Sequence, residues 1–323
     1  MQQLLESIGR LRILVIGDLM LDHYVWGDAT RISPEAPVPV VNVERDTFTA
    51  GGAANVALNL RALGVAVDLV GTLGADSQGE CLARVLAGHG LAVDAPLTSA
   101  DRPTIVKTRV MCRSQQLCRL DREAAPPVYA LPDAWLESAL AERVARADAV
   151  ILSDYAKGVV TTALIQRVQQ LAGPERLVSL DPKPRPGLAF SGLGLITPNR
   201  SEALLLAQLQ GAAAVDAFPA EEVCRRLHAE HATQLLVVTL GADGMLISRG
   251  GRVVQRVPTA ARAVFDVSGA GDTVTAVLTA ALAAGADAET AVQLANIAAG
   301  VVVAKLGTAT ASPEEILAHA QCI

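Results

Sequence analysis

The sequence predicts an α/β fold in which helices cover both faces of a central, mostly parallel sheet, with a small antiparallel β lid attached. Short apolar runs rich in β-branched residues alternate with longer stretches of helical periodicity. Hydrophobic residues make up 51% of the 323 residues, so the chain can bury a large core. Two further segments alternate in polarity with no helical stretch inside them, as half-exposed antiparallel strands do.

Five apolar runs are expected to be buried strands, and most of them end in a polar residue or glycine. They are residues 12–18, 148–154, 176–182, 194–197 and 234–241. Helical stretches lie between such runs, for example residues 53–63 before Gly64. This alternation implies parallel strands joined by right-handed crossovers. Ligands bind such sheets beyond the carboxyl ends of the strands, where Asp18, Asp154 and Asp181 fall.

The two segments that break this alternation span about residues 19–46 and about residues 103–122. We interpret them as one small sheet that projects from the main body as a lid. An ordinary pair of surface hairpins fits the same pattern equally well. No internal repeat is found, and a single domain over residues 1–323 is expected.

Composition excludes several classes of protein. The formal net charge of −6 argues against a nucleic-acid partner and against a basic membrane-binding patch. No apolar run reaches the ~18 residues of a membrane-spanning helix, and the N-terminus lacks the pattern of a signal peptide. The five cysteines are scattered without a CxxC pair, which argues against a zinc site or a disulfide framework. A cytoplasmic location is therefore expected.

The stretch VFDVSGAGDTVTAVL, residues 264–278, places Gly269, Ala270 and Gly271 directly before Asp272 and a helical run. The start of a helix carries unpaired N–H groups and a partial positive charge, and small residues let a phosphate approach them closely. Asp272 has two interpretations. It is either a helix N-cap or a general base placed beside a phosphate-binding turn.

Four other motifs accompany this turn. They are the GxxGxDxxG of Gly71, Gly74, Asp76 and Gly79, the pair Gly51–Gly52 before a helix that carries Asn55, the NxxE of Asn199 and Glu202, and the loop of Thr239, Gly241 and Gly244. In this order, from about residue 12 to residue 311, the five motifs resemble those of the ribokinase-like family of carbohydrate kinases.

The resemblance implies that Asp272 is the catalytic base and deprotonates the sugar hydroxyl that attacks ATP. The N–H groups of Gly269, Ala270, Gly271 and Asp272 would then stabilise the transferring phosphoryl group. Asn199 and Glu202 match the NxxE that helps to hold Mg²⁺ and the phosphates, Glu202 through water. Glu202 is also placed to interact with the N-terminus of its own helix.

The remaining nucleotide contacts implied by the resemblance come from the C-terminal half of the chain. Thr239, Gly241 and Gly244 match the nucleotide loop, and Asn296 and Gly307 fall where the family lines the adenine pocket. Asn296 equally fits a core position in which the backbone satisfies its amide. The family's loop for a monovalent cation is matched by Asp266 and Ser268, so dependence on K⁺ is an open expectation.

The sugar site of the family is built from strand ends and from the glycine pair. Here it would contain carboxylates and amides suited to vicinal hydroxyls, together with one lysine. These residues are Asp18, Asp22, Gly51, Gly52, Asn55, Asp154 and Lys157. Asp22 equally fits a solvent-facing residue at the hinge of the lid.

Three strings, at residues 17–41, 109–121 and 153–184, resemble the branch of the family that phosphorylates heptose 7-phosphate in ADP-heptose (lipopolysaccharide core) synthesis. The implied product is the 1,7-bisphosphate. Candidate cations for the far phosphate are Arg113, Lys157, Lys183 and Arg185. Lys183 could instead serve the nucleotide phosphates, and Arg113 could be a solvated lid residue.

Some relatives in this branch carry a nucleotidyltransferase domain with an HxGH motif, and none of the five histidines here forms one. The kinase step alone is therefore expected, with adenylyl transfer left to a separate protein. Lid sheets in this family often pair, so a homodimer through the lid is expected. A kinase for another sugar or sugar phosphate, or a non-catalytic sugar-phosphate sensor, remains an alternative. No GxGxxG follows the first strand, which excludes a Rossmann dehydrogenase.

Overall fold

The computed structural model describes residues 1–113, 115–209 and 218–321. Its main sheet has eight strands in the order β14-β13-β12-β11-β10-β9-β1-β4. Their bounds are β1 Arg12–Gly17, β4 Ala66–Val70, β9 Ala149–Ser153, β10 Leu177–Asp181, β11 Leu195–Ile196, β12 Leu235–Thr239, β13 Met245–Arg249 and β14 Arg252–Val257. The pairings from β4 to β12 are parallel, and β13 and β14 add antiparallel strands at one edge. The predicted α/β fold is confirmed.

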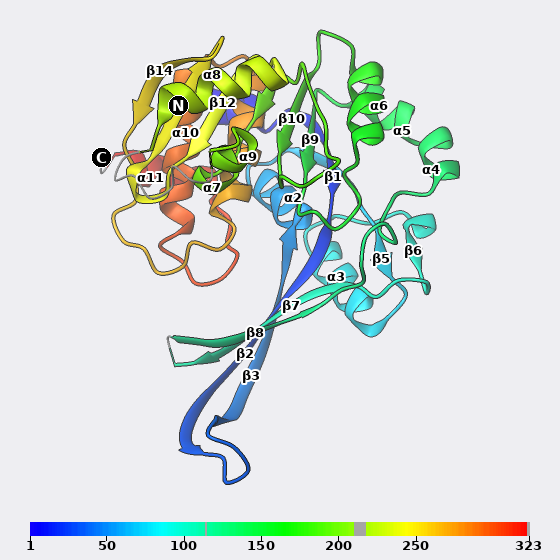
Figure 1. The fold of residues 1–323 in the computed structure, drawn as a ribbon, viewed down its shortest axis with the longest axis vertical. Helices are drawn as coiled ribbons and strands as arrows, with labels where there is room; N and C mark the ends of the chain where they lie inside the picture. The colour runs from blue at the N-terminus through cyan, green and yellow to red at the C-terminus, as the bar shows by residue number, and fades with distance from the viewer. Residues whose placement is uncertain (114, 210–217, 322–323) are drawn as a thin grey trace.

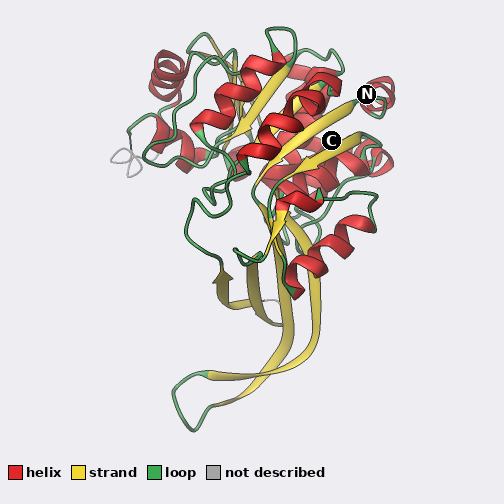
Figure 2. Ribbon diagram, turned by 90° about the vertical axis from the view of Figure 1, so that its right-hand side faces the viewer, coloured by secondary structure: helices red, strands yellow, loops and turns green. Residues whose placement is uncertain are grey.

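Helices cover both faces of this sheet (Figures 1 and 2). They are α1 Gln2–Ile8, α2 Ala53–Ala62, α3 Ser77–Ala87, α4 Asp133–Ser138, α5 Leu140–Arg146, α6 Thr162–Ala172, α7 Arg200–Leu206, α8 Ala220–His231, α9 Ala270–Ala283, α10 Ala288–Val302 and α11 Pro313–Ala320. Successive residues of a strand face opposite ways. Ile151 therefore packs in the core with α2, α9 and α10, while Val150 and Leu152 pack in a second core with α5, α6 and α8.

A separate four-stranded sheet projects from the main body (Figure 1). Its strands, in the order β3-β2-β7-β8, are β3 Pro39–Gly52, β2 Leu19–Ile32, β7 Ile105–Cys112 and β8 Gln115–Arg122. The two outer pairs are antiparallel, but β2 and β7 pair in parallel. The predicted antiparallel lid is confirmed in the two outer pairs, whereas the central pair is parallel because β2 and β7 both leave the body in the same direction. We call this sheet the lid.

The carboxyl ends of the body strands lie beside the root of the lid. A single residue, Asp18, separates β1 from β2, and the second lid strand β3 leads directly into α2. The short strands β5 Leu73–Gly74 and β6 Thr98–Ser99 form a small parallel pair nearby. No helix within the described residues is long and apolar enough to cross a bilayer.

Candidate active site

Asp272 lies in the first turn of α9 but does not cap it. The N-cap of α9 is Gly269, with φ +78°, and no side chain caps this end. The Asp272 carboxylate is 3% exposed and accepts hydrogen bonds from Asn55 Nδ2 at 2.8 Å and from the Tyr155 hydroxyl at 2.7 Å. A Cβ at Gly269 would lie 2.5 Å from Asn55 Nδ2, so glycine is needed for this approach.

The environment of Asp272 suits it to accept a proton. Burial raises the pKa of this carboxyl to about 6, although the hydrogen bonds from Asn55 and Tyr155 act in the opposite direction. A base with a pKa just below neutral is mostly ionised at pH 7 and still takes up a proton readily. The N-cap interpretation of Asp272 is wrong, because Gly269 is the N-cap, and the general-base interpretation stays a prediction.

The backbone beside Asp272 offers unpaired donors. The N–H of Ala270 donates to the Val267 carbonyl at 3.3 Å, whereas those of Gly269, Gly271 and Asp272 have no acceptor among the described residues. A Cβ at Gly271 would meet nothing within 4 Å, so this side of the turn faces open space. Donors at a helix N-terminus that face open space suit an anion.

Gly271 borders two cavities, and the larger one suits a nucleotide base. It encloses about 440 Å³ and is lined mainly by apolar groups from β12, α9 and α10. Thr239, Gly241, Gly244 and Asn296, all expected to bind nucleotide, lie in its wall. The Asn296 amide donates to the Pro258 carbonyl at 2.7 Å, so the backbone satisfies its polar end while the side chain lines the cavity.

Gly307, expected in the same wall, lies elsewhere. Its N–H donates to Asp266 Oδ2 at 3.0 Å, and Asp266 Oδ1 accepts from the Ser268 N–H at 2.9 Å. With φ +73°, Gly307 passes against the ring of Tyr24. Its place is therefore a brace for the loop before α9, and both carboxylate oxygens of Asp266 are engaged in that brace.

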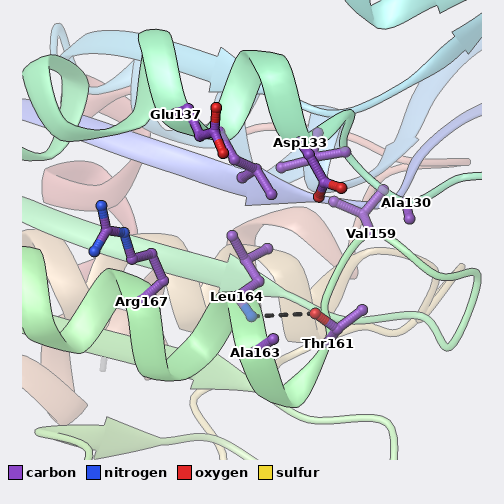
Figure 3. Close-up of a pocket in the computed structure, with 10 residues that line it drawn as sticks. Ala130, Asp133, Glu137, Val159, Thr161, Ala163, Leu164 and Arg167 are labelled. Atoms are coloured by element: carbon purple, nitrogen blue, oxygen red, sulfur yellow. Dashed lines mark hydrogen bonds between the residues drawn. The ribbon is translucent and has the colours of Figure 1, made fainter.

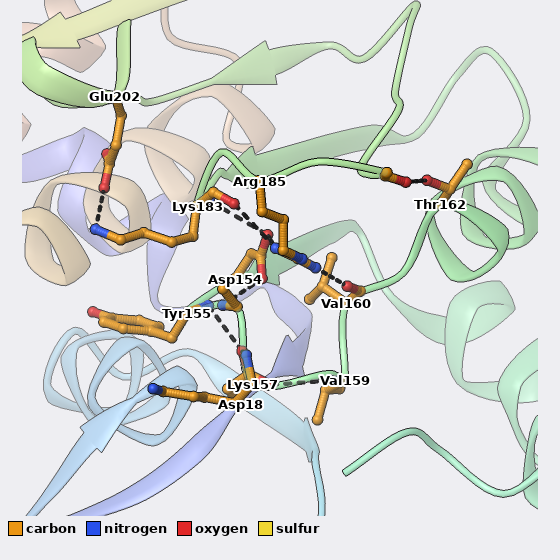
Figure 4. Close-up of polar contacts among 12 residues, drawn as sticks. Asp18, Asp154, Tyr155, Lys157, Val159, Val160, Thr162, Lys183, Arg185 and Glu202 are labelled. Carbon is orange, nitrogen blue, oxygen red and sulfur yellow. Dashed lines mark hydrogen bonds and ion pairs between the residues drawn. The ribbon is translucent and has the colours of Figure 1, made fainter. Parts of the chain in front are cut away.

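The smaller cavity, of about 180 Å³, is polar and also borders Gly271 and Thr239. Lys183 Nζ lies 3.0 Å from Glu202 Oε1 in its wall (Figure 4). Glu202 and Asn199 form a reciprocal capping box at the start of α7, with bonds of 2.9 and 3.0 Å. Glu202 therefore interacts with the N-terminus of its own helix, as one of its two interpretations required, and Asn199 is the N-cap of that helix.

Asp181, at the end of β10, is the third acidic residue of this cavity and was not expected to bind metal. Burial, together with Glu202, Asp272 and Asp154 nearby, raises the pKa of Asp181 well above its ordinary value. Its carboxylate accepts no hydrogen bond from the described residues. Mg²⁺ is held by one or two carboxylates together with substrate phosphates. Asp181 and Glu202 fit this requirement, whereas no three His, Cys, Asp or Glu within the described residues form a complete metal site.

Two carboxylates expected to bind sugar are used within the protein instead. Asp18 accepts the N–H groups of Tyr155, Lys157 and Val159 at 2.8, 3.0 and 3.0 Å (Figure 4). Asp154, whose side chain is fully buried, pairs with Arg185 at 2.5 Å. Both carboxylates are therefore buried and hydrogen-bonded within the protein, and their contact with sugar stays a prediction.

Arg185 and Lys157 are also engaged within the protein. The Arg185 guanidinium donates to the carbonyls of Val160 and Lys183 besides pairing with Asp154, so it is not free for a phosphate. Lys157 Nζ lies 2.6 Å from Glu123 Oε1. Asn55, expected to bind sugar, instead donates to Asp272 and thereby orients the base.

The root of the lid carries the other expected sugar ligand, Asp22. It is 3% exposed and pairs with Arg109 at 2.5 Å, so it does not face solvent as the hinge interpretation required. A Cβ at Gly51 would lie 2.4 Å from Asp22 Oδ2, which explains the first glycine of the pair. The second, Gly52, is the N-cap of α2 with φ +60°.

Arg113, a candidate for the far phosphate, lies away from this group. Its side chain is 77% exposed and pairs with Asp28 at 3.1 Å. Arg113 directly follows Cys112, which lies opposite Gly27 in the pairing of β7 with β2. Gly27 is five positions along β2 from Asp22, or roughly 16 Å of strand. The solvated-lid interpretation of Arg113 therefore describes this chain.

Three residues at the site were missed by the sequence analysis: Tyr155, Lys107 and Arg109. Tyr155 contacts Asp272, and Lys107 Nζ lies 5.1 Å from the centre of the Tyr155 ring. The alternation of the strand indicated that Lys107 and Arg109 share a face, but gave no sign that the face covers Asp272. Tyr155 directly follows Asp154 at a strand end, which was the available signal.

A groove of about 480 Å³ between α4 and α6 is separate from this site (Figure 3). Its wall contains Asp133, Glu137 and Arg167 besides apolar groups. None of the expected site residues lines it. We therefore assign the chemistry to the two cavities beside Gly271.

Comparison with known proteins places these features in a family. The model of the pfkB family carbohydrate kinases matches residues 10–315. The Bifunctional protein HldE of Geobacter metallireducens is 43% identical over 312 residues, which are 95% of this chain and 62% of that protein. The protein of the same name from Azotobacter vinelandii is 47% identical over 313 residues, 95% of this chain and 63% of its own length. The chain thus spans less than two thirds of these relatives.

Solved structures with the same fold are more distant in sequence. The Arabidopsis thaliana ribokinase complexed with ribose and ATP superposes with a TM-score of 0.73 at 20% identity, covering 96% of this chain and 98% of its own. Phosphofructokinase-2 of Escherichia coli in complex with potassium gives a TM-score of 0.73 at 19% identity, covering 97% and 98%. These likenesses establish a ribokinase-like fold.

Proposed function

The chain belongs to the pfkB family of carbohydrate kinases, and we propose that it phosphorylates the anomeric hydroxyl of D-glycero-D-manno-heptose 7-phosphate with ATP, yielding the 1,7-bisphosphate. The single observation that carries a phosphoryl-transfer role is the buried base Asp272 beside unpaired N–H groups. Two findings support heptose 7-phosphate as the substrate: the sequences of residues 17–41, 109–121 and 153–184, which resemble the heptose branch of the family, and the relatives named HldE. The reaction belongs to ADP-heptose synthesis and, as it consumes ATP, to the cytoplasm.

In this mechanism Asp272 takes the proton of the sugar hydroxyl as its oxygen forms a bond to the γ-phosphorus of ATP. The bond from that phosphorus to the bridging oxygen breaks, and ADP leaves. The N–H groups of Gly269, Gly271 and Asp272 stabilise the charge on the transferring group. An anomeric hydroxyl is more acidic than an ordinary alcohol, which suits a carboxylate base with a pKa of about 6.

We propose that Mg²⁺ accompanies the nucleotide and is held on its phosphates by Asp181 and Glu202. Bound there, it would offset the negative charge of the phosphates. Lys183, 3.0 Å from Glu202, is placed to contact the same phosphates. K⁺ dependence through the loop of Asp266 and Ser268 is a separate proposal. Two assays test the ions separately. Chelation of Mg²⁺ should abolish activity and added Mg²⁺ should restore it, and in a second assay K⁺ is replaced by a bulky organic cation while Mg²⁺ is kept.

We further propose a homodimer formed through the lid. Strand β8 is exposed along its whole length, and large apolar side chains such as Val43 and Leu120 are 57% and 60% exposed. Among the residues that the structure describes, no strand pairs with the outer edges of β3 and β8. Light scattering at micromolar concentration should give twice the chain mass, and Leu120→Lys should lower it. Val254→Lys, on β14, is the control, and a monomeric wild type would contradict the proposal.

The test of function is release of ADP from Mg-ATP with a panel of acceptors. The panel contains heptose 7-phosphate, ribose, fructose, fructose 6-phosphate and mannose. Turnover with heptose 7-phosphate alone is expected. Turnover with another acceptor would retain the base and the anion site but reject the heptose assignment. Binding of sugar phosphate without turnover would indicate a sensor, which the intact base and free N–H groups oppose.

A further inference from the structure

Lys107 is a half-buried cation with no partner. It lies on β7, opposite Asp22 of β2, and the Asp22 carboxylate is already paired with Arg109. Among the residues that the structure describes, Lys107 Nζ has neither an ion pair nor a hydrogen bond. The ammonium lies over the face of the Tyr155 ring, 5.1 Å from the ring centre.

Lys107 is flanked by three cations that each pair with a carboxylate: Arg109 with Asp22, Arg119 with Asp121 and Lys157 with Glu123. Burial lowers the pKa of this ammonium, Asp22 opposes that effect, and Lys157, Arg119 and Arg109 lower the pKa further. Burying a charge without a partner of its own is unfavourable. A site that keeps such a lysine gains from an anion that enters, because the neighbouring carboxylates are already paired and the anion accepts hydrogen bonds from the ammonium.

The position of Lys107 ties it to the acceptor rather than to the nucleotide. Tyr155, whose ring lies beneath Lys107, donates its hydroxyl to Asp272. The apolar cavity assigned to the nucleotide base is lined by neither Lys107 nor Tyr155. Tyr155 lines the smaller polar cavity, and Lys107 does not. Lys107 therefore stands on the lid side of the base, where the body of the sugar would extend away from its reacting hydroxyl.

We propose that Lys107 binds the phosphate at the far end of the acceptor, so that it selects a phosphorylated sugar over a neutral one. This rests on the proposed function in so far as the acceptor carries a phosphate. Lys157, held by Glu123 at 2.6 Å, lines the same side as a weaker contributor. Arg113 takes no part, because it lies beyond the root of the lid and pairs with Asp28.

The experiment compares Lys107→Met, which keeps the stem and removes the charge, with Lys107→Arg, which keeps a charge. For heptose 7-phosphate we expect KM to rise ~10–100-fold in the Met variant, as for loss of a charge-assisted hydrogen bond, and to recover largely in the Arg variant. KM for ATP should stay within ~2-fold, because Lys107 does not face the nucleotide. Arg31→Gln, an exposed charge on the same lid, is the matched control.

Each outcome decides the proposal. An unchanged KM for the sugar phosphate in Lys107→Met, or an equal rise in the KM for ATP, overturns it. Circular dichroism and thermal unfolding should show Lys107→Met folded and at least as stable as wild type, since it removes an unpaired buried charge. If the wild type does not phosphorylate heptose 7-phosphate but does phosphorylate fructose 6-phosphate, the heptose assignment is wrong. The same Lys107 variants then test the phosphate-binding proposal with fructose 6-phosphate as the acceptor. Turnover with neutral sugars alone overturns both.

Discussion

Replacing Asp272 by asparagine should make the protein more stable and nearly inactive. Asparagine cannot accept the proton of the acceptor hydroxyl, so kcat should fall ~10²–10⁴-fold. The neighbouring hydrogen bonds can persist, because Asn55 can donate to the amide oxygen and the Tyr155 hydroxyl can accept from the amide nitrogen. What disappears is the cost of keeping a charge in a site that is 3% exposed.

The magnitude follows from the pKa of about 6, which lies above the ordinary value of 3.8. The folded state therefore binds the proton more tightly than the unfolded chain, and the resulting stability is complete below pH 3.8 and lost as the pH rises through 6. The free energy of unfolding of the wild type should lie below that of Asp272→Asn by about 1.5 kcal/mol at pH 5 and by about 3 kcal/mol at pH 7.

The assay is urea unfolding followed by circular dichroism at pH 5 and pH 7, together with ADP release at pH 7.5. Glu175→Gln, an exposed carboxylate on a loop, is the control and should change neither stability nor rate. A variant that keeps more than a tenth of wild-type kcat would refute Asp272 as the base. A gain in stability that is equal at the two pH values, or a loss, would refute the account of a buried charge.

Three other changes probe separate parts of the molecule. Tyr155→Phe removes a hydrogen bond that lowers the pKa of Asp272, so the acid limb of the pH–kcat profile should move up by ~1 pH unit. Burial acts to raise the pKa of Asp76, but hydrogen bonds from Thr104 and Gly79 outweigh it and lower that pKa. Asp76→Asn should therefore lower the free energy of unfolding, measured in urea, by about 1–2 kcal/mol, and by more at pH 7 than at pH 4. Ala299→Phe fills the apolar cavity, so KM for ATP should rise ~10-fold or more while that for sugar holds.

The sequence predicted those features that depend on neighbouring residues. The buried strands were recognised from β-branched runs, and the observed bounds of β9 and β10, Ala149–Ser153 and Leu177–Asp181, fall within the expected ranges. The start of α9 was recognised because Gly269, Ala270 and Gly271 precede a helical run. Each of these signals lies within one turn or one strand, where periodicity and residue size are informative.

Features that depend on contacts between distant segments were not predictable in this way. Asn55 and Tyr155 lie 217 and 117 residues from Asp272, which both contact. The parallel pairing of β2 and β7 depends on the direction in which each strand leaves the body, which alternation in polarity does not encode. Lys107 was missed for the same reason, since only this pairing brings β7 over Tyr155.

Asp18, predicted to bind sugar, makes all of its hydrogen bonds in the structure within the protein. Its backbone carbonyl accepts from Ala53 at 3.0 Å and so fixes the start of α2, the helix that carries Asn55. Its carboxylate, although burial raises its pKa, holds the N–H of Tyr155 at 2.8 Å. Both donors to Asp272 therefore depend on Asp18. An aspartate at the end of the first strand is needed here because its contacts position the two side chains that donate to Asp272.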